Sequence, residues 1–390
     1  MGFEDLLPDL CSRVAAVRRD IHAHPELAFG ELRTAETVAA WLKNLGLEVF
    51  TGIARTGVIA RLSCGSSPRA IGLRADMDAL PLDELNTFPH RSRHTGQMHA
   101  CGHDGHSAML LGAAEVLAKT RNFDGSVYFI FQPAEEHEGG GRVMVEEGVF
   151  ERFPMDMVFG LHNWPGLAAG SIAVHSGPVM AGADRFEIVV TGHGGHAAMP
   201  HQAVDSVVAG SALVQSLQTL VSRHVDPLDS AVLSVTRFHA GHADNVLPEQ
   251  AVLGGTVRTF SSELQARMEE GIARICTGIE ATYGVRVELN YERGYPPTLN
   301  AEEPTFIARE VARHVVGSEQ TLTHLRPSMG AEDFAYLAAV VPGCYVWLGN
   351  GPGEGGCMLH SPHYDFNDAV IPTGIRYWVR LAERALAAAR

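Results

Sequence analysis

The sequence has no apolar run long enough to cross a membrane. Hydrophobic residues make up 46% of its 390 positions, yet no stretch approaches the roughly 20 consecutive apolar residues that a membrane helix needs. The N-terminal stretch places acids before basic residues and lacks the basic, apolar, small-residue order of a secretory signal. Leu6 stands where an N-myristoylation signal has Ser or Thr. We therefore expect a globular protein without membrane spans, lipid anchor or export signal.

Basic residues are also scarce. The chain has 30 Lys and Arg against 45 Asp and Glu, a formal net charge of −15, and no basic run interrupts this balance. This charge argues against nucleic acid as a partner. The six cysteines are scattered and form no disulfide framework. Because free thiols persist best in a reducing compartment, we expect the protein in the cytoplasm.

Helical and strand patterns alternate along the first half of the chain. Helical periodicity covers residues 11–25 and 31–46, and apolar runs typical of buried strands cover 70–76, 126–132 and 157–162. Alternating strands and helices predict an α/β fold with a doubly wound, mostly parallel sheet. In such a sheet, ligands bind beyond the carboxyl ends of the strands.

From residue 184 the pattern changes. Strands and helices now follow in the order βαββαβ, the ferredoxin-like arrangement of an α+β domain. Paired prolines at 296–297 precede the return of the first pattern. We expect a discontinuous first domain, residues 1–183 and 295–390, that carries an inserted α+β domain of residues 184–294.

Three histidines and a cysteine crowd the stretch HACGHDGH at 99–106, just before an apolar helical run. Asp104 is expected to cap a helix that begins near Gly105. Cys101 and His103 would then lie in the preceding turn, where their side chains can converge on one point. Because such a pair alone is more often structural than metal binding, further ligands are needed.

Other donors follow buried strands elsewhere in the chain. The strand at 126–132 runs almost directly into Glu135 and Glu136, and charges beside a buried strand need partners. His162 ends the strand at 157–162, and His360 lies in a glycine-rich context. Five side chains thus offer the nitrogen, oxygen and sulfur donors that bind zinc or similar transition metals: Cys101, His103, Glu136, His162 and His360. Five protein ligands suggest two ions that share a water.

Seven motifs together resemble the M20 metallopeptidase family. They are RADMDALP (74–81), MHACGHDGHSAMLLGAA (98–114), QPAEEHEGGG (132–141), LHN (161–163), GHGGHAAMPH (192–201), SMGAEDFAY (328–336) and LHSPHYDFND (359–368). The chain is most similar to the amidohydrolase branch of this family, which includes hippurate hydrolases, N-acyl-amino-acid amidohydrolases and auxin-conjugate hydrolases. The resemblance spans nearly the whole chain, and its motifs are specific in combination.

The resemblance implies a dimetal catalytic domain with an inserted lid or dimerisation domain. The metal ligands that it implies are Cys101, His103, Glu136, His162 and His360. The wider family has a ligand histidine two residues before Asp76, whereas this sequence has Arg74 there. In the amidohydrolase branch the Cys101 and His103 pair fills the site instead. Asp76 would orient one of the metal ligands without binding the metal itself.

The resemblance also implies catalytic and substrate-binding roles. Glu135 would be the general base that takes a proton from a metal-bridging water and returns it to the leaving nitrogen. His196 resembles a lid histidine that family dimers supply to the partner subunit's active site. Asn245 and Arg258 resemble residues that hold the substrate's free carboxylate, for which an arginine fork is well suited.

We therefore predict a metal-dependent amidohydrolase that cleaves N-acyl amino acids, such as hippurate or N-acetyl amino acids, to a carboxylic acid and a free amino acid. Its cofactors are expected to be two divalent ions per subunit, Zn, Mn, Ni or Co. Its expected partners are the small-molecule substrate and a second copy, in a homodimer through the lid domain, with a homotetramer as the alternative. Glu332 and Asp333 are expected to be acidic residues that either line the active site or have a structural role, and the sequence does not separate the two roles.

Three alternatives stay open. A metallo-dipeptidase or aminopeptidase of the same family would recognise a free amino terminus. A thiol hydrolase would use Cys101 as its nucleophile and a histidine as the base. A noncatalytic metal-dependent binding protein would have no need of Glu135 beside its metal ligands.

Overall fold

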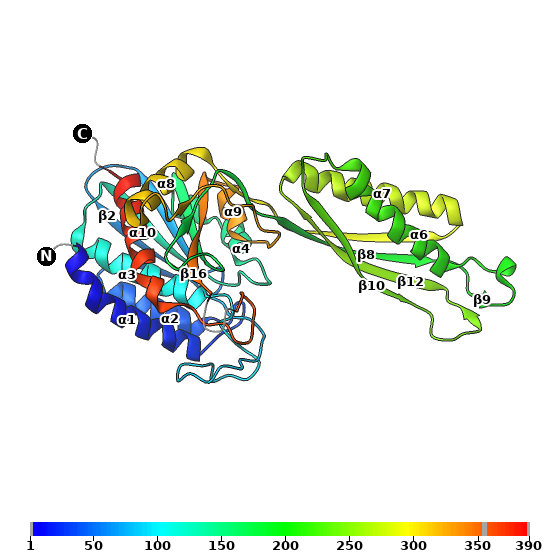
Figure 1. Cartoon of the computed structure of the whole chain (residues 1–390), viewed down its shortest axis with the longest axis horizontal. Coiled ribbons are helices and arrows are strands. Elements are labelled where there is room, and N and C mark those ends of the chain that lie inside the picture. Colours follow the sequence, from blue (N-terminus) through cyan, green and yellow to red (C-terminus); the bar gives the residue numbers. More distant parts are fainter. Residues whose placement is uncertain (1–2, 353–356, 388–390) are drawn as a thin grey trace. The chain divides into compact units, whose positions relative to one another are not determined.

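The computed structural model describes residues 3–352 and 357–387 and folds into two compact units (Figure 1). The first unit comprises Met1–Val179, Leu299–Arg326 and Asp333–Arg390, and the second comprises Met180–Thr298 and Pro327–Glu332. The second unit is therefore inserted in the first along the chain. None of the described helices is long and apolar enough to span a membrane.

An eight-stranded sheet runs through the first unit. Among the described residues, its strands lie in the order β1-β2-β4-β3-β5-β16-β6-β15. The central strands β4, β3, β5 and β16 run parallel to one another. The pairs β1-β2, β2-β4 and β16-β6 are antiparallel, and the edge pair β6-β15 is parallel. The strands are β1 (Glu48–Ile53), β2 (Gly57–Cys64), β3 (Ala70–Asp76), β4 (Gly125–Gln132), β5 (Met157–Pro165), β6 (Ile172–Ala173), β15 (Thr321–Leu322) and β16 (Gly343–Gly351). This arrangement confirms the expected α/β fold with a mostly parallel sheet.

Helices cover both faces of this sheet. Strand β16 shows the division, because Cys344 and Val346 enter the core formed with α1, α3 and α10, whereas Tyr345 between them packs on Phe334 of α9. Figure 1 shows α1, α3 and α10 lying together. The helices are α1 (Phe3–Ala23), α2 (Leu32–Asn44), α3 (His103–Thr120), α4 (Gly140–Glu146), α5 (Val149–Arg152), α8 (Glu302–Val316), α9 (Phe334–Ala338) and α10 (Ile371–Ala385).

Helix α3 is the central helix of the first unit. All residues from its start through Leu117 are buried, as expected for a helix that is apolar nearly all round. Small residues permit this packing, because Gly112 leaves room for Ile375 of α10 and Val14 of α1. The hydroxyl of Ser107 donates to the carbonyl of the last residue of β3 (2.8 Å). The start of α3 is thereby fixed at the carboxyl end of the parallel strands.

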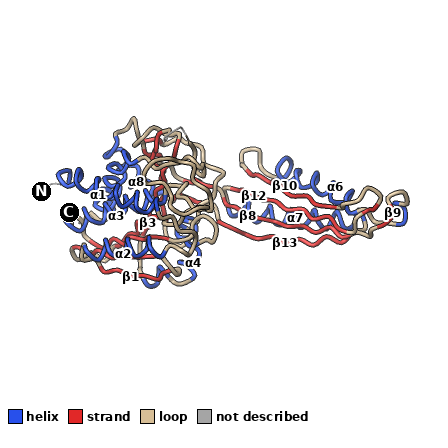
Figure 2. Tube along the Cα trace, turned by 90° about the horizontal axis from the view of Figure 1, so that it is seen from below, coloured by secondary structure: helices blue, strands red, loops and turns tan. Residues whose placement is uncertain are grey.

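The second unit is a four-stranded antiparallel sheet with two helices. Its strands, in the order β10-β12-β8-β13, lie side by side in Figure 2. Its elements are β8 (Gly182–Thr191), α6 (Ser206–Thr219), β10 (Ala231–Ala240), β12 (Gln250–Thr259), α7 (Ser262–Tyr283) and β13 (Arg286–Tyr295), which follow as βαββαβ. Helix α7 begins after Ser261, whose Oγ accepts a hydrogen bond from the Leu264 N–H (3.1 Å). An apolar core, with Ile188, Leu213 and Ile272 among its members, joins the helices to the sheet.

Candidate metal centre

The turn before α3 presents Cys101 and His103 on either side of Gly102. Gly102 has φ of 98°, a backbone conformation that glycine adopts without strain. A Cβ at this position would also clash with the side chains of Asn163 and Tyr364. The close approach of these side chains therefore requires glycine, and it places both flanking side chains at the carboxyl edge of the sheet.

Two histidines are held with one ring nitrogen free to bind a metal. Nδ1 of His103 lies 2.9 Å from the carbonyl oxygen of Asp78, and Nδ1 of His162 lies 2.6 Å from the carbonyl oxygen of Asn163. Because a carbonyl only accepts, each Nδ1 carries a proton, and Nε2 is the ring atom of each histidine that can bind a metal. Nε2 of His162 lies 3.3 Å from Sγ of Cys101.

Glu136 and His360 come to the same place from distant segments. Oε1 of Glu136 lies 3.4 Å from Nε2 of His360 and 3.8 Å from Nε2 of His103. The backbone N–H of His360 donates to the carbonyl of Ala100 (2.8 Å), which ties the C-terminal segment to the turn before α3. The structure thus brings together all five of the side chains predicted as ligands.

The donor set fits a dinuclear metal centre. Nε2 of His103 and Oε1 of Glu136 are buried and have no hydrogen-bond partner among the described residues, an arrangement that is costly unless something else binds them. Five groups of side chains in the described part of the chain have ligand atoms within 4.8 Å of one another, and three of these groups contain at least two of the predicted ligands: Cys101, His103 and His162; Cys101, Glu136 and His360; and His103, Glu135 and Glu136. Shared members suit two neighbouring ions, and thiolate, imidazole and carboxylate donors suit transition metals.

The charges around this junction also favour cation binding. Burial disfavours the charged form of His103, but Asp76, Asp78 and Glu136 together raise its pKa to about 10. Burial, with the neighbouring carboxylates, raises the pKa of the Cys101 thiol well above its usual range. Metal ions at this position would displace both protons, so we expect metal binding to release protons.

Asp78 anchors the adjacent glutamates, a role that sequence reasoning missed. Its Oδ1 accepts the backbone N–H of Glu135 and its Oδ2 accepts that of Glu136, both at 3.0 Å. Its carbonyl orients His103, as described above. The only sequence signal is that Asp78 follows Asp76 by two residues in RADMDALP.

Asp76, predicted to orient a ligand, makes its direct hydrogen bond to a different histidine. Its Oδ1 lies 2.6 Å from Nδ1 of His106, whereas its Oδ2 lies 3.7 Å from Nε2 of His103. Nε2 of His106 accepts the backbone N–H of Asn163 (2.9 Å), and the His106 ring packs on His162 with centroids 4.5 Å apart. His106 was missed at the sequence level, although its position three residues after His103 places both on one helix face.

Arg74 occupies the place where the wider family has a ligand histidine, and the residue is fully buried. Its guanidinium donates to Asp76 (2.8 Å), Asp333 (2.9 Å) and Gln132 (2.9 Å). The other Asp333 oxygen accepts the backbone N–H of Gly141 (2.7 Å). Asp333 therefore neutralises Arg74 and supports the segment after β4. Glu332, its neighbour in sequence, belongs to the second unit.

The expectation that Asp104 caps α3 is wrong. The helix begins at His103, its N-cap is Gly102, and no side chain makes the capping hydrogen bond. Asp104 is instead buried within the first turn, where its Oδ2 lies 2.9 Å from Nδ1 of His22 and 3.3 Å from Arg18. Cationic partners on α1 made this carboxylate a core residue rather than a cap.

His196 and Asn245 lie together at one end of the second unit. His196 is on β9 (Gly195–His196), which pairs with β11 (Val246–Leu247), and the N–H of Ala197 donates to the carbonyl of Asn245 (3.1 Å). These segments adjoin the end of the sheet where Thr191 pairs with Gln250. His196 is exposed to solvent.

Arg258 lies near the other end of the same sheet, on β12 beside Ala183. Eight residues of strand, about 26 Å at 3.3 Å per residue, separate it from Gln250. Its guanidinium donates to the neutral oxygens of Thr256 and Val257, and burial lowers its pKa. Within one chain, the structure therefore does not bring Arg258 together with His196.

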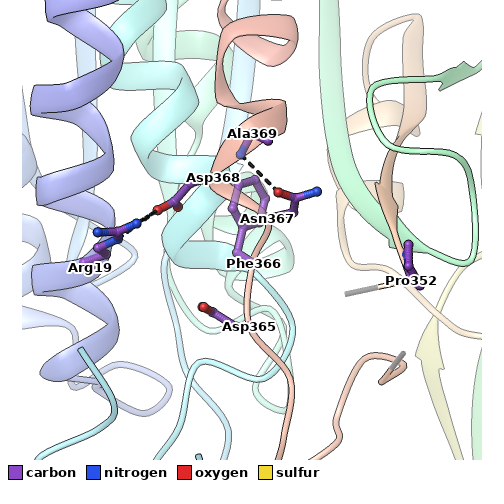
Figure 3. Close-up of a pocket in the computed structure, with 7 residues that line it drawn as sticks. All are labelled: Arg19, Pro352, Asp365, Phe366, Asn367, Asp368 and Ala369. Atoms are coloured by element: carbon purple, nitrogen blue, oxygen red, sulfur yellow. Dashed lines mark hydrogen bonds and ion pairs between the residues drawn. The ribbon is translucent and has the colours of Figure 1, made fainter. Parts of the chain in front are cut away.

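The pocket in Figure 3, of about 400 Å³, differs from the metal centre in having satisfied polar groups. Arg19 pairs with Asp368 at 2.8 Å, and Oδ1 of Asn367 accepts the backbone N–H of Ala369 at 3.1 Å. Asp365 in turn bonds Arg18 at 2.7 Å. Because these groups partner one another, the metal centre is the stronger candidate for the functional site.

Comparison with known proteins places the chain in a family. Residues 72–384 match the model described as peptidase family M20/M25/M40. The chain is 42% identical over 378 residues to the hippurate hydrolase of Campylobacter jejuni, covering 97% of this chain and 98% of that protein. It is 45% identical over 300 residues to an N-acyl-L-amino acid amidohydrolase of Geobacillus stearothermophilus, covering 76% and 80%.

A solved structure gives the same result. A Bacillus subtilis protein described as a dinuclear metal binding peptidase from the M20 family has a TM-score of 0.85 to this chain at 35% identity, covering 97% of this chain and 99% of that one. The family match and these identities extend over most of the chain. The chain therefore belongs to peptidase family M20/M25/M40, within which it is a metal-dependent amidohydrolase.

Proposed function

We propose that the protein hydrolyses the amide bond of N-acyl amino acids, releasing a carboxylic acid and a free amino acid. The observation that carries this proposal is the pair Glu135 and Glu136 beside the other donors. Because the five predicted ligands include Glu136 but not Glu135, we assign Glu135 to proton transfer. The relatives named hippurate hydrolase and N-acyl-L-amino acid amidohydrolase support this substrate class.

The proposed mechanism uses Glu135 as a proton shuttle. Two divalent ions, held by the five predicted ligands, would polarise the amide carbonyl and lower the pKa of a water molecule. Glu135 accepts a proton as the water oxygen adds to the amide carbon, and it delivers that proton to the amide nitrogen as the C–N bond breaks. Its main chain is anchored on Asp78, which fixes the position from which the carboxylate works.

Arg258 of one copy and Asn245 of a second copy are proposed to hold the substrate's free carboxylate, because within one chain the two residues lie near opposite ends of the inserted sheet. The hydrogen bonds of Arg258 go to neutral oxygens, so its charge is available to an anionic ligand. A guanidinium can bind a carboxylate through two parallel hydrogen bonds. This recognition favours N-acyl amino acids over simple amides.

We propose a homodimer through the inserted unit, with a homotetramer as the alternative. Strand β10 forms an edge of the sheet, and Phe238 on it is 39% exposed. An open edge strand offers unpaired N–H and C=O groups to a second copy. His196 lies at the end of the sheet away from Arg258, which supports its action in a partner's site.

Zn, Mn, Ni and Co remain the proposed metals. Cys101 and the histidine ligands favour Zn, Co and Ni, whereas Glu136 also suits Mn. A cytoplasmic location is proposed on the six free cysteines.

A thiol hydrolase is the second candidate function. It is favoured by the 3.3 Å separation between Sγ of Cys101 and Nε2 of His162. However, burial raises the pKa of the Cys101 thiol, which disfavours the thiolate that such a nucleophile needs. Loss of activity on chelation, restored by Zn, Mn, Co or Ni, would exclude this function, and activity that persists in metal-free protein would favour it.

A kinetic screen on enzyme of defined metal content tests the proposal. Its substrates are hippurate, N-acetyl amino acids and unblocked dipeptides. We expect turnover of the N-acylated compounds and little of the dipeptides. Preference for unblocked dipeptides would instead identify a metallo-dipeptidase or aminopeptidase. Metal binding without turnover of any of them would favour a noncatalytic binding protein.

A further inference from the structure

Three consecutive backbone N–H groups at the catalytic segment are accepted by buried carboxylates. The N–H groups of Glu135 and Glu136 bond Asp78, as described above. The N–H of Ala134, one residue earlier, donates to Oε1 of Glu31 (2.9 Å), and Oε2 of Glu31 accepts the hydroxyl of Thr56 (2.6 Å). Glu31 is thus the second carboxylate that holds this segment, although it lies 103 residues away in sequence.

Glu31 stands at the N-cap position of α2, but its side chain makes no capping hydrogen bond. Glu26 satisfies the start of the helix instead, because its two oxygens accept the N–H groups of Arg33 (3.0 Å) and Thr34 (2.9 Å). Capping of the first N–H groups of α2 therefore does not explain why a carboxylate is buried at position 31.

Ala134 is clamped in an unusual backbone conformation. Its φ is 55°, in the left-handed region that residues with a Cβ adopt only at a cost of order 1–3 kcal/mol. Its N–H is held by Glu31, and its carbonyl accepts the N–H of Gly140 (2.9 Å). A Cβ on Gly140 would clash with the carbonyl of Pro133. These contacts fix the bend from which Glu135 projects.

The Glu31 carboxylate is buried at a cost that these contacts only partly offset. Glu31 is fully buried, and its side chain accepts hydrogen bonds from two neutral donors, the hydroxyl of Thr56 and the N–H of Ala134. Burial, together with the charge of Asp78, raises its pKa to about 7 against the opposing bond from Thr56. A buried carboxylate without a bonded cation is expensive. A carboxylate at this position is explained if the Ala134 segment needs a strong hydrogen-bond acceptor for its N–H group.

We propose that Glu31 is a positioning residue that holds Ala134 in its bent conformation and so aims the carboxylate of Glu135 at the reacting amide. The inference rests on the proposed function, in which Glu135 is the general base. The side chain of Glu31 bonds Thr56 and Ala134, neither of which is a predicted metal ligand. A displacement of about 1 Å at a reacting group can cost about 10²-fold in rate.

Two substitutions at Glu31 and one matched control test this role. Glu31→Leu removes the acceptor at similar volume, and we expect kcat to fall about 10²-fold with KM and metal content unchanged. Glu31→Gln keeps an acceptor for Ala134 and a donor for Thr56, and we expect it to retain most of kcat. Glu26→Ala damages the same end of α2 without touching Ala134, so its kcat should be unchanged.

A second measurement does not depend on activity. Hydrogen exchange of the Ala134 amide, followed in metal-free protein, should become at least about tenfold faster in Glu31→Leu and stay unchanged in Glu31→Gln and Glu26→Ala. If wild-type protein hydrolyses no N-acyl amino acid, the proposed function fails, and exchange alone still decides whether Glu31 holds the segment.

Three results would overturn the inference about Glu31. The first is a Glu31→Leu enzyme with wild-type kcat and wild-type exchange. The second is loss of kcat in Glu31→Gln as large as in Glu31→Leu, since the glutamine keeps the hydrogen bond. The third is loss of bound metal in Glu31→Leu, which would mean that Glu31 acts on the ligand Glu136 rather than on Glu135.

Discussion

At the scale of single residues, adjacent glutamates are given different tasks by their surroundings. Oε1 of Glu136 faces Nε2 of His103 and Nε2 of His360, where a metal ion would be bound. Oε1 of Glu135 instead lies 3.4 Å from the backbone N–H of Asp333. Because Asp78 holds both main-chain N–H groups, the division depends on the directions of the two side chains and not on their chemistry.

Glu135→Ala should separate metal binding from catalysis. We expect this variant to keep its metal but to lose about 10²- to 10⁴-fold in kcat, because a general base contributes about that much. Metal content by elemental analysis and turnover of an N-acyl amino acid are the two measurements. Glu136→Ala is the matched control and should lose metal. A metal-loaded Glu135→Ala enzyme with near-normal turnover would remove Glu135 from the mechanism.

The raised pKa of Glu31 predicts a pH-dependent difference in stability. Its pKa is about 7 in the folded protein against an ordinary value of 4.5, so the folded state binds the proton more tightly than the unfolded state does. The resulting stabilisation is present below pH 4.5 and is lost as pH rises through 7. Relative to wild type, Glu31→Gln should therefore gain up to about 3 kcal/mol in free energy of unfolding between pH 5 and 8.

Urea unfolding of metal-free wild type and Glu31→Gln at several pH values measures this difference. The metal-free condition removes the pH dependence of metal binding from the comparison. A constant difference between the two proteins over this range would show that Glu31 ionises normally in the folded state.

At the scale of elements, the start of α3 depends on a glycine. Gly102→Ala places a Cβ against Asn163 and Tyr364 at a φ of 98°. We expect a loss of about 1–3 kcal/mol in free energy of unfolding from the backbone conformation alone. Metal affinity should also fall, since Cys101 and His103 flank the altered turn.

Gly278→Ala in α7 is the control for this substitution. A Cβ there meets no atom within 4 Å, so alanine in the helix should stabilise the protein by up to about 1 kcal/mol. Denaturant unfolding of both variants measures the change in free energy of unfolding, and metal titration measures the change in metal affinity. Equal effects of the two substitutions would mean that Gly102 has no special role in the turn.

The elements themselves could be predicted from sequence because their signals are local. Apolar runs predicted β3, β4 and β5, and helical periodicity predicted α1 and α2. The side chains that support the metal centre carry no such signal. Asp104 pairs with Arg18 86 residues away, and Glu31 bonds Ala134 103 residues away. These partners are found only in the folded chain. For this reason Asp104 was wrongly predicted to cap α3, and the structural roles of Asp78 and Glu31 were not predicted.

At the scale of the whole molecule, the inserted unit separates the residues proposed for one substrate site. Arg258 adjoins the end of the sheet where the chain enters, since Ala183 and Gly182 pair with Arg258 and Thr259. His196 lies near the opposite end, beside the β11 segment. If both act on one substrate, a symmetric dimer gives a simple explanation, because each copy can then supply its distal histidine to the other.

Complementation between two inactive variants tests such a shared site. His196→Ala should inactivate the enzyme with its metal content intact, because His196 lies outside the metal ligands. In an equal mixture with Glu135→Ala, half of the randomly reassembled dimers are mixed, and each mixed dimer has one site with both residues. We therefore expect recovery of about a quarter of wild-type activity.

A mixture of Glu135→Ala with Cys101→Ala is the control. Both changes lie in the same unit and damage each chain's own site, so this mixture should recover no activity. Absence of rescue in the first mixture, once mixed dimers have been shown by native mass spectrometry, would mean that His196 serves its own chain or no active site at all.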